Sequence, residues 1–377
     1  MSCVIIRAKF ILTLNNMRDI IAPLLVIFFI SPLSACAAVD NAVNKRDIVM
    51  SEALTLMEGG PNAPSEIKPS AESSVPPGDN KNNSLFSGWE KSKQIFASGD
   101  AYISVGAKLG YIQGDTTYNF DHKTSELEFP MNNWMAGGNI GVGFKDFSVN
   151  TELWGQIEEY AGYDMKDKDW DSTGALVSYT KSKADMDAFI WDINLRYDFF
   201  KNACPWENDF LILSKSDQIK IGALLGYRHE RFGYQMSELK YPDLNDIILY
   251  PGQRIGTYKI KYSLPYVGLV TEIANPKYGL SFNIKYSFKP TAKDQDNHIL
   301  RYLTFYGDYD KKGYAIMGCF SGFFKIKEAL KISLGIDGEV IRIKGTTWEE
   351  NHDPGWDADQ DTDAKYMLFW SGVEYKF

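Results

Sequence analysis

Residues 189–199 read FIWDINLRYDF, a stretch in which apolar and polar side chains alternate almost throughout. Residues 280–288 (LSFNIKYSF) and 330–337 (LKISLGID) repeat the same period of two. Neighbouring side chains of an extended strand point to opposite faces. Each stretch therefore predicts a β-strand with one apolar and one polar face.

Ten segments with this pattern follow residue 100, most of them roughly 9–13 residues long, which suits tilted strands that cross a bilayer. A soluble antiparallel sandwich gives the same alternation. Charges on the polar faces suit a wet lumen, however, and the chain alternates up to a terminal Phe377. An even number of strands is typical of single-chain bacterial barrels. The sequence thus predicts an all-β fold, a ten-stranded antiparallel transmembrane β-barrel, with strands near residues 101–113, 134–145, 147–158, 186–200, 217–231, 257–272, 277–289, 311–324, 328–343 and 365–377.

The connections between these segments alternate between short and long. Lys145-Asp146 and Asn275-Pro276 predict tight turns on the periplasmic side. The long connections are expected to be extracellular loops, and they comprise residues 114–133, 159–185, 232–256, 290–310 and 344–364.

The composition agrees with a membrane barrel and excludes other classes. Only 44% of the residues are hydrophobic, which disfavours a bundle of membrane helices, whereas 22 Tyr and 22 Phe suit bilayer interfaces. A formal net charge of −9 disfavours nucleic acid as a partner and favours cationic substrates. The four cysteines lack CxxC spacing, so neither a disulfide framework nor a zinc site is indicated.

The N-terminal part predicts export. Residues 1–38 read as a signal sequence, with a short apolar run that ends in small residues. Leu33-Ser34-Ala35-Cys36 also fits the lipobox of a bacterial lipoprotein, so lipoprotein processing and ordinary cleavage near Ala38 both stay open. Residues 39–98 include a stretch rich in Pro, Gly, Ser and Asn and are expected to form a disordered periplasmic linker.

Two acidic segments stand out in the long connections. Residues 164–172 read DMKDKDWDS and residues 294–298 read DQDNH. In an extended segment Asp296 points the same way as His298, so it can orient the imidazole and stabilise its protonated form. This arrangement predicts a general base near neutral pH, and the alternative is a pair of solvated acidic loops.

Three blocks of the sequence resemble the omptins, the aspartate-dependent outer-membrane endopeptidases of Gram-negative bacteria. Asp167-Lys168-Asp169-Trp170 matches the family's Asp-x-Asp-Trp segment, and Asp294-x-Asp296-x-His298 matches its second catalytic segment. Residues 251–269, PGQRIGTYKIKYSLPYVGL, resemble its most recognisable strand. The three blocks occur in order, and the resemblance covers roughly residues 100–377.

The resemblance implies an omptin-type β-barrel protease domain over residues 99–377, in the bacterial outer membrane with its active site facing the cell exterior. By that resemblance Asp167 and Asp169 face Asp296 and His298 across a groove, and the four hold the water that attacks the peptide bond. His298 takes the proton of this water, so no acyl-enzyme, metal or other cofactor is expected. A serine-type mechanism is the alternative, with Ser182 as the nearest candidate.

The substrate pocket departs from the family pattern. The family pairs a glutamate with the aspartate that aligns with Asp294, but Tyr118 stands at the glutamate position. Asp115 is the nearest acidic residue that could replace it. We expect Asp294 and Tyr118 to contact the substrate, and we expect a broad preference for basic, cationic peptides or proteins.

The resemblance also implies lipopolysaccharide as a partner and activator. The expected binding residues on the outer face of the barrel are Tyr227, Arg231 and Lys261, and His229 stands where the family has a glutamate. The alternative is that these residues are ordinary interface anchors.

Two further functions compete with a protease. A catalytically silent barrel could serve as a surface adhesin or receptor, but such a barrel has no physical reason to keep all four catalytic residues. A passive porin is disfavoured because the lumen of ten strands is narrow enough to be filled by side chains.

Overall fold

The computed structural model describes residues 101–120, 124–158, 160–203, 218–244, 247–350 and 357–377. The expected signal sequence (residues 1–38) and linker (residues 39–98) lie outside these residues. Within the described ranges, no helix is both long and apolar enough to cross a membrane.

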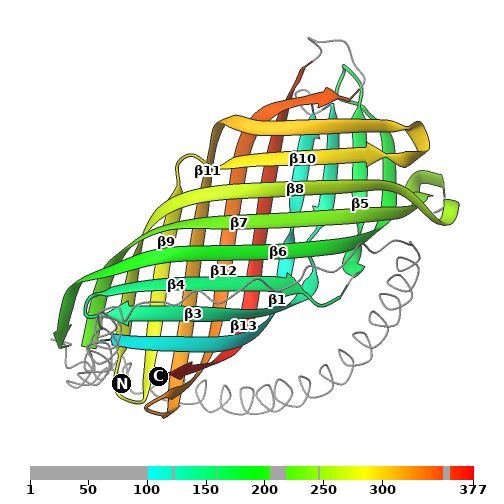
Figure 1. The fold of residues 1–377 in the computed structure, drawn as a ribbon. Helices are drawn as coiled ribbons and strands as arrows, with labels where there is room; N and C mark the ends of the chain where they lie inside the picture. Colours follow the sequence, from blue (N-terminus) through cyan, green and yellow to red (C-terminus); the bar gives the residue numbers. More distant parts are fainter. Residues whose placement is uncertain (1–100, 121–123, 159, 204–217, 245–246, 351–356) are drawn as a thin grey trace, which may run out of the picture. The chain divides into compact units, whose positions relative to one another are not determined.

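Nearly every described residue belongs to one of thirteen strands (Figure 1). Two short 3-10 helices, η2 (Pro242–Leu244) and η3 (Ile299–Arg301), lie between strands. The strands are β1 (Ala101–Phe120), β2 (Ser125–Pro130), β3 (Asn133–Phe144), β4 (Phe147–Gln156), β5 (Tyr160–Trp170), β6 (Leu176–Ala203), β7 (Gln218–Tyr241), β8 (Ile247–Ala274), β9 (Tyr278–Ser287), β10 (Thr291–His298), β11 (Leu303–Lys327), β12 (Leu330–Glu349) and β13 (Ala358–Lys376).

Ten of these strands form a closed antiparallel ring. The order of pairing is β1-β3-β4-β6-β7-β8-β9-β11-β12-β13, and β13 pairs with β1 again. Closure leaves no unpaired edge, so every strand can satisfy its backbone hydrogen-bonding groups in lipid. The predicted ten-stranded barrel is therefore confirmed.

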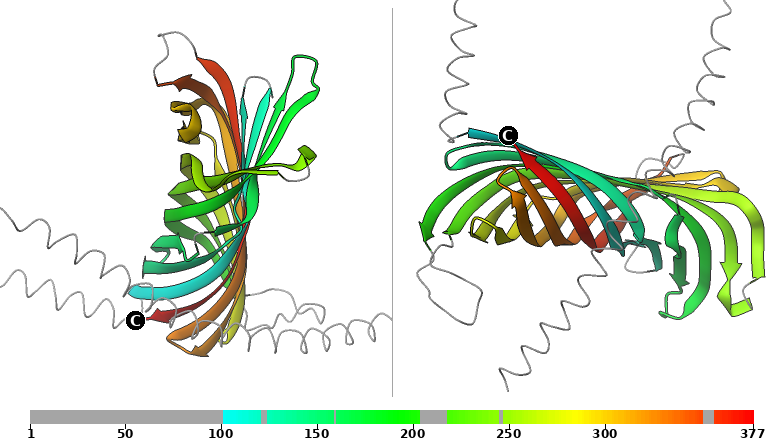
Figure 2. Two further views of the ribbon diagram at one scale, coloured as in Figure 1. Left: turned by 90° about the vertical axis from the view of Figure 1, so that its right-hand side faces the viewer. Right: turned by 90° about the horizontal axis from the view of Figure 1, so that it is seen from below.

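A second ring of ten strands continues the barrel above the first. In it, β2 and β5 replace β3 and β4, and β10 replaces β9. The connections that the sequence led us to expect as long extracellular loops are thus mostly strands. The period of two continues through them, but polar residues occupy both faces and hide it. The upper hairpins project from one end of the barrel (Figure 2).

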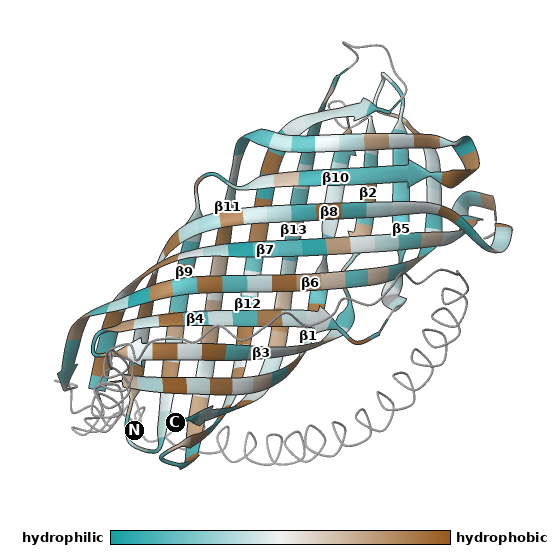
Figure 3. Ribbon diagram, in the orientation of Figure 1, coloured by the Kyte–Doolittle hydropathy of each residue, from teal (hydrophilic) through white to brown (hydrophobic). Residues whose placement is uncertain are grey.

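The outer surface of the lower ring is apolar. Brown positions alternate with paler or teal ones along β4 and β6 (Figure 3). Large apolar side chains that face outward and are exposed include Ile140, Val142, Phe147, Val149, Leu195, Leu269, Phe282, Ile284, Leu334 and Ile336. A continuous exposed apolar surface of this kind is what a lipid bilayer covers.

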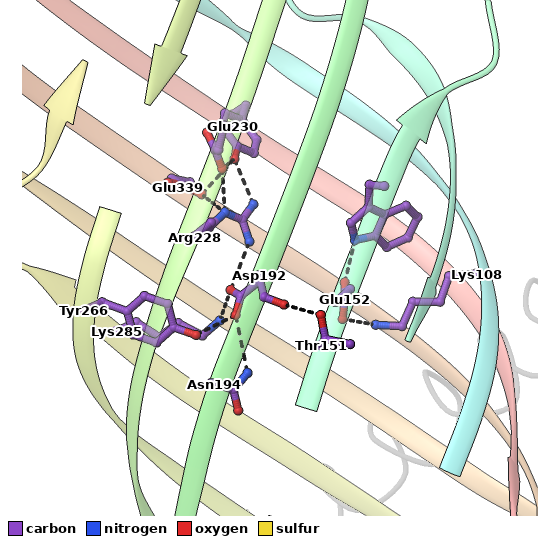
Figure 4. A network of polar contacts seen from close by, with 12 residues as sticks. Lys108, Thr151, Glu152, Asp192, Asn194, Arg228, Glu230, Tyr266, Lys285 and Glu339 are labelled. Carbon is purple, nitrogen blue, oxygen red and sulfur yellow. Dashed lines mark hydrogen bonds and ion pairs between the residues drawn. The ribbon is translucent and has the colours of Figure 1, made fainter. Parts of the chain in front are cut away.

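Charged side chains cross the lumen at the level of this apolar surface (Figure 4). Asp192 pairs with Lys285 at 2.7 Å and with Arg228 at 3.6 Å, and Lys108 pairs with Glu152 at 2.5 Å. Pairing matters because an isolated buried charge is costly. A cavity of about 290 Å³ remains among these side chains. A lumen crossed in this way is a poor passive pore.

Candidate functional site

Both acidic segments lie on strands of the upper ring, where the sequence had indicated loops. Asp167 and Asp169 belong to β5, and Asp296 and His298 belong to β10. In the order β1-β2-β5-β6-β7-β8-β10-β11-β12-β13, three strands separate β5 from β10 on one side and five on the other. The two segments therefore face each other across the upper barrel.

His298 and Asp296 are hydrogen-bonded, with 3.0 Å between Nε2 and Oδ2. Asp296 is only 3% exposed, and the imidazole packs edge-on against Phe305. Burial lowers the pKa of His298, but the hydrogen bond and the negative charge of Asp296 outweigh it, so the pKa is raised above its usual value. Asp296 thus holds the imidazole in place and stabilises its protonated form.

Asp167 shares an electrostatic environment with the other three predicted catalytic residues. Burial, followed by the charge of Asp169, raises the pKa of Asp167 to about 6. His298 opposes this rise and Asp296 adds to it, so these side chains lie close enough to interact. Asp167 is paired on either side with the buried residues Leu127 and Thr180, which places its side chain on the inner face.

Arg301, at the end of η3, is a site residue that sequence reasoning missed. Its charge lowers the pKa of both Asp167 and His298. One feature of the sequence could have indicated it. Arg301 follows His298 by only three residues, in the segment that connects β10 to β11.

Asp294 lies one inward position below Asp296 and is 7% exposed. Its Oδ2 accepts hydrogen bonds from the hydroxyls of Tyr258, at 3.0 Å, and Tyr309, at 2.7 Å. Burial raises the pKa of Asp294 to about 6, although the two tyrosine hydroxyls oppose the rise. A Cβ at Gly307 would lie 2.3 Å from Oδ1, so only glycine at position 307 leaves room for this carboxylate.

Tyr118 is buried beside Asp294, and its ring centroid lies 5.9 Å from that of Tyr258. Asp115 is three residues away along β1, so it faces the outside of the barrel. There it accepts a hydrogen bond from Thr117, and Glu128 raises its pKa in addition to burial. Asp115 therefore does not take the place of the missing glutamate.

The remaining predicted residues also have clear positions. Tyr227, Arg231 and Lys261 face outward on β7 and β8, where Arg231 and Lys261 are direct cross-strand neighbours. Arg231 forms an ion pair of 2.8 Å with Asp187. Ser182 is 2% exposed and paired with Met165, below Asp167, which makes it a poor nucleophile for a bound peptide.

Comparisons with known proteins agree with this architecture. The model of the Omptin family matches residues 100–361. The chain is 23% identical to the outer membrane protease OmpP of Escherichia coli strain K12, over 70% of this chain and 85% of that protein. It is 23% identical to protease 7 of Escherichia coli O157:H7, over 73% of this chain and 87% of that protein.

A third relative, the plasminogen activator of Yersinia pestis, is 24% identical over 54% of this chain and 65% of that protein. Among solved structures, the translocator domain of the autotransporter NalP from Neisseria meningitidis is 10% identical with a TM-score of 0.31, over 78% of this chain and 98% of that one. The family match spans most of the barrel and both halves of the site, and the chain belongs to the omptin family.

Proposed function

We propose that this protein is an outer-membrane endopeptidase that hydrolyses peptide bonds at the barrel end facing the cell exterior. The observation that carries the proposal is the Asp296–His298 hydrogen bond, which faces Asp167 and Asp169 inside the upper ring. The apolar outer surface of the lower ring supports the membrane location. The relatives named as outer membrane proteases support the activity.

In the proposed mechanism, a water molecule lies between the two pairs of residues. Neutral His298 removes a proton from this water as its oxygen attacks the peptide carbonyl carbon, and Asp296 stabilises the resulting imidazolium. With a pKa of about 6, Asp167 is the carboxyl group that can share a proton with Asp169 and donate it to the developing oxyanion. His298 then gives its proton to the leaving amine. The C–N bond breaks, the re-forming carbonyl returns the other proton to Asp167, and no acyl-enzyme forms.

The silent adhesin or receptor is the less favoured function. A barrel that only binds a partner has no use for a buried aspartate held against an imidazole or for a second carboxyl group with a raised pKa across from it. Both features are costly for stability and suit catalysis.

The ionisation of His298 gives a testable pH dependence. Neutral His298 and protonated Asp167 are both required, so the plot of kcat/KM against pH should be bell-shaped, with one limb near pH 6 and the other above the ordinary histidine value of about 6.5. In Asp296→Asn, the charge that raises the pKa is gone, while burial and Arg301 still lower it, so the pKa of His298 should fall. NMR titration of the refolded barrel measures this without needing activity, with His298→Ala assigning the signal. An unchanged pKa in Asp296→Asn would contradict the pairing.

We also propose that lipopolysaccharide binds the outer face at Arg231 and Lys261 and activates the enzyme. Two adjacent cations just above the apolar surface can bind a lipid phosphate. The double variant Arg231→Glu/Lys261→Glu should lose most of the stimulation by lipopolysaccharide. Lys277→Glu, in the exposed β8–β9 turn, is the control and should keep it. Equal stimulation of both variants would rule out this surface.

A further inference from the structure

The carboxylate of Asp294 is nearly saturated by the protein itself. Its Oδ2 accepts hydrogen bonds from the hydroxyls of Tyr258 and Tyr309. The backbone amide of Gly307 donates a further hydrogen bond to the carboxylate. A carboxylate offers about four acceptor positions. About one acceptor position of Asp294 is therefore left for a substrate side chain.

A second acceptor lies nearby without a partner. Gln360 on β13 is 1% exposed, and its amide lies against the hydroxyl of Tyr309. Among the described residues, neither its Oε1 nor its Nε2 has a hydrogen-bond partner. A buried carbonyl oxygen without a donor is costly, and a ligand that supplies one removes that cost.

The side chains of arginine and lysine differ in the number and arrangement of hydrogen-bond acceptors that they need. A guanidinium pairs best with both oxygens of one carboxylate, through two parallel N–H donors, and it carries five N–H groups in all. An ammonium is a compact charge with three donors that can point to separate acceptors.

We propose that Tyr258, Tyr309 and Gln360 make the pocket at Asp294 selective for the ammonium of lysine over the guanidinium of arginine. This inference rests on the proposed peptidase function. A lysine uses the remaining acceptor of Asp294 and the Oε1 of Gln360. An arginine cannot pair with both oxygens of Asp294, because Oδ2 is already filled, and it leaves buried N–H groups without acceptors.

The test compares kcat/KM for three peptides that differ only in the residue before the scissile bond, which is lysine, arginine or norleucine. The wild-type barrel, with lipopolysaccharide, should cleave the lysine peptide about tenfold faster than the arginine peptide, and the norleucine peptide more slowly still. Tyr309→Phe keeps the ring but frees one acceptor of Asp294. It should raise cleavage at arginine relative to lysine several-fold, as should Tyr118→Glu, which adds a second carboxylate.

Tyr314→Phe is the matched control, because Tyr314 faces outward on β11, away from the pocket, and its lysine-to-arginine ratio should stay at the wild-type value. Arginine cleaved as fast as lysine by the wild type overturns the inference, as does an unchanged ratio in Tyr309→Phe. Equal cleavage of all three peptides also overturns it but leaves the peptidase function standing. No cleavage of any peptide by the folded wild-type barrel overturns both.

Discussion

His298→Ala should lower kcat/KM for peptide cleavage by a factor of about 10³–10⁴ while the barrel stays folded. The imidazole is the group placed to take the proton from the attacking water, and the alanine variant leaves no base of similar pKa beside Asp296. The side chain is partly exposed at the upper end of β10, so its removal leaves the strand pairing intact. Cleavage of a lysine peptide measures the loss, and migration of the unheated barrel in detergent gels checks the fold.

Asn297→Ala is the matched control, because Asn297 adjoins His298 on β10 and points to the opposite face, where its amide donates a hydrogen bond to Thr257. It should keep near-wild-type turnover. Asp296→Asn should also lose most activity, because the neutral amide no longer stabilises the imidazolium. A folded His298→Ala barrel with near-wild-type kcat/KM would remove His298 from the mechanism.

Asp167→Asn and Asp169→Asn should each lower kcat by a factor of about 10²–10³, because they remove the carboxyl groups that position the water and stabilise the oxyanion. Two neighbouring aspartates provide controls. Asp171 caps the β5–β6 turn by accepting hydrogen bonds from Thr173 and Ala175, and Asp164 pairs with Lys240 at 3.2 Å. Asn at either control position should change kcat by no more than about twofold, as surface substitutions do.

The comparison of these four variants on one peptide also tests the alignment. The structure has Asp167 and Asp169 on the inner face and Asp171 in an exposed turn. If Asp171→Asn lost as much activity as Asp167→Asn, the catalytic aspartates would have been assigned to the wrong positions.

The lower ring could be predicted from the sequence because each strand there has one apolar and one polar face. Each of the ten expected segments overlaps one of the ten strands that close it, although strands such as β6, β7 and β8 extend well beyond the expected ends. The upper ring could not, because both faces are polar there. In β5, for example, Asp167 and Asp169 face inward while Lys168 pairs with Glu126 on the outside at 2.7 Å. A period of two then carries no hydropathy signal.

The predicted site residues came from spacing and resemblance, and their environment came only from the structure. Asp296 and His298 share a face because they are two residues apart on a strand, which the sequence predicts. The contacts of Asp294 with Tyr258 and Tyr309 join residues on three different strands. The register between those strands is set by closure of the barrel. The sequence alone therefore does not distinguish a tyrosine that contacts Asp294 from one that packs elsewhere in the barrel.

The most direct test of the account is mass spectrometry of a mixed peptide library after incubation with the refolded barrel and lipopolysaccharide. The wild-type protein should produce new peptide termini, concentrated after lysine, and the double variant Asp167→Asn/His298→Ala should produce almost none. The account would be contradicted if the folded wild-type barrel generated no new termini, or if the double variant generated the same ones at a similar rate.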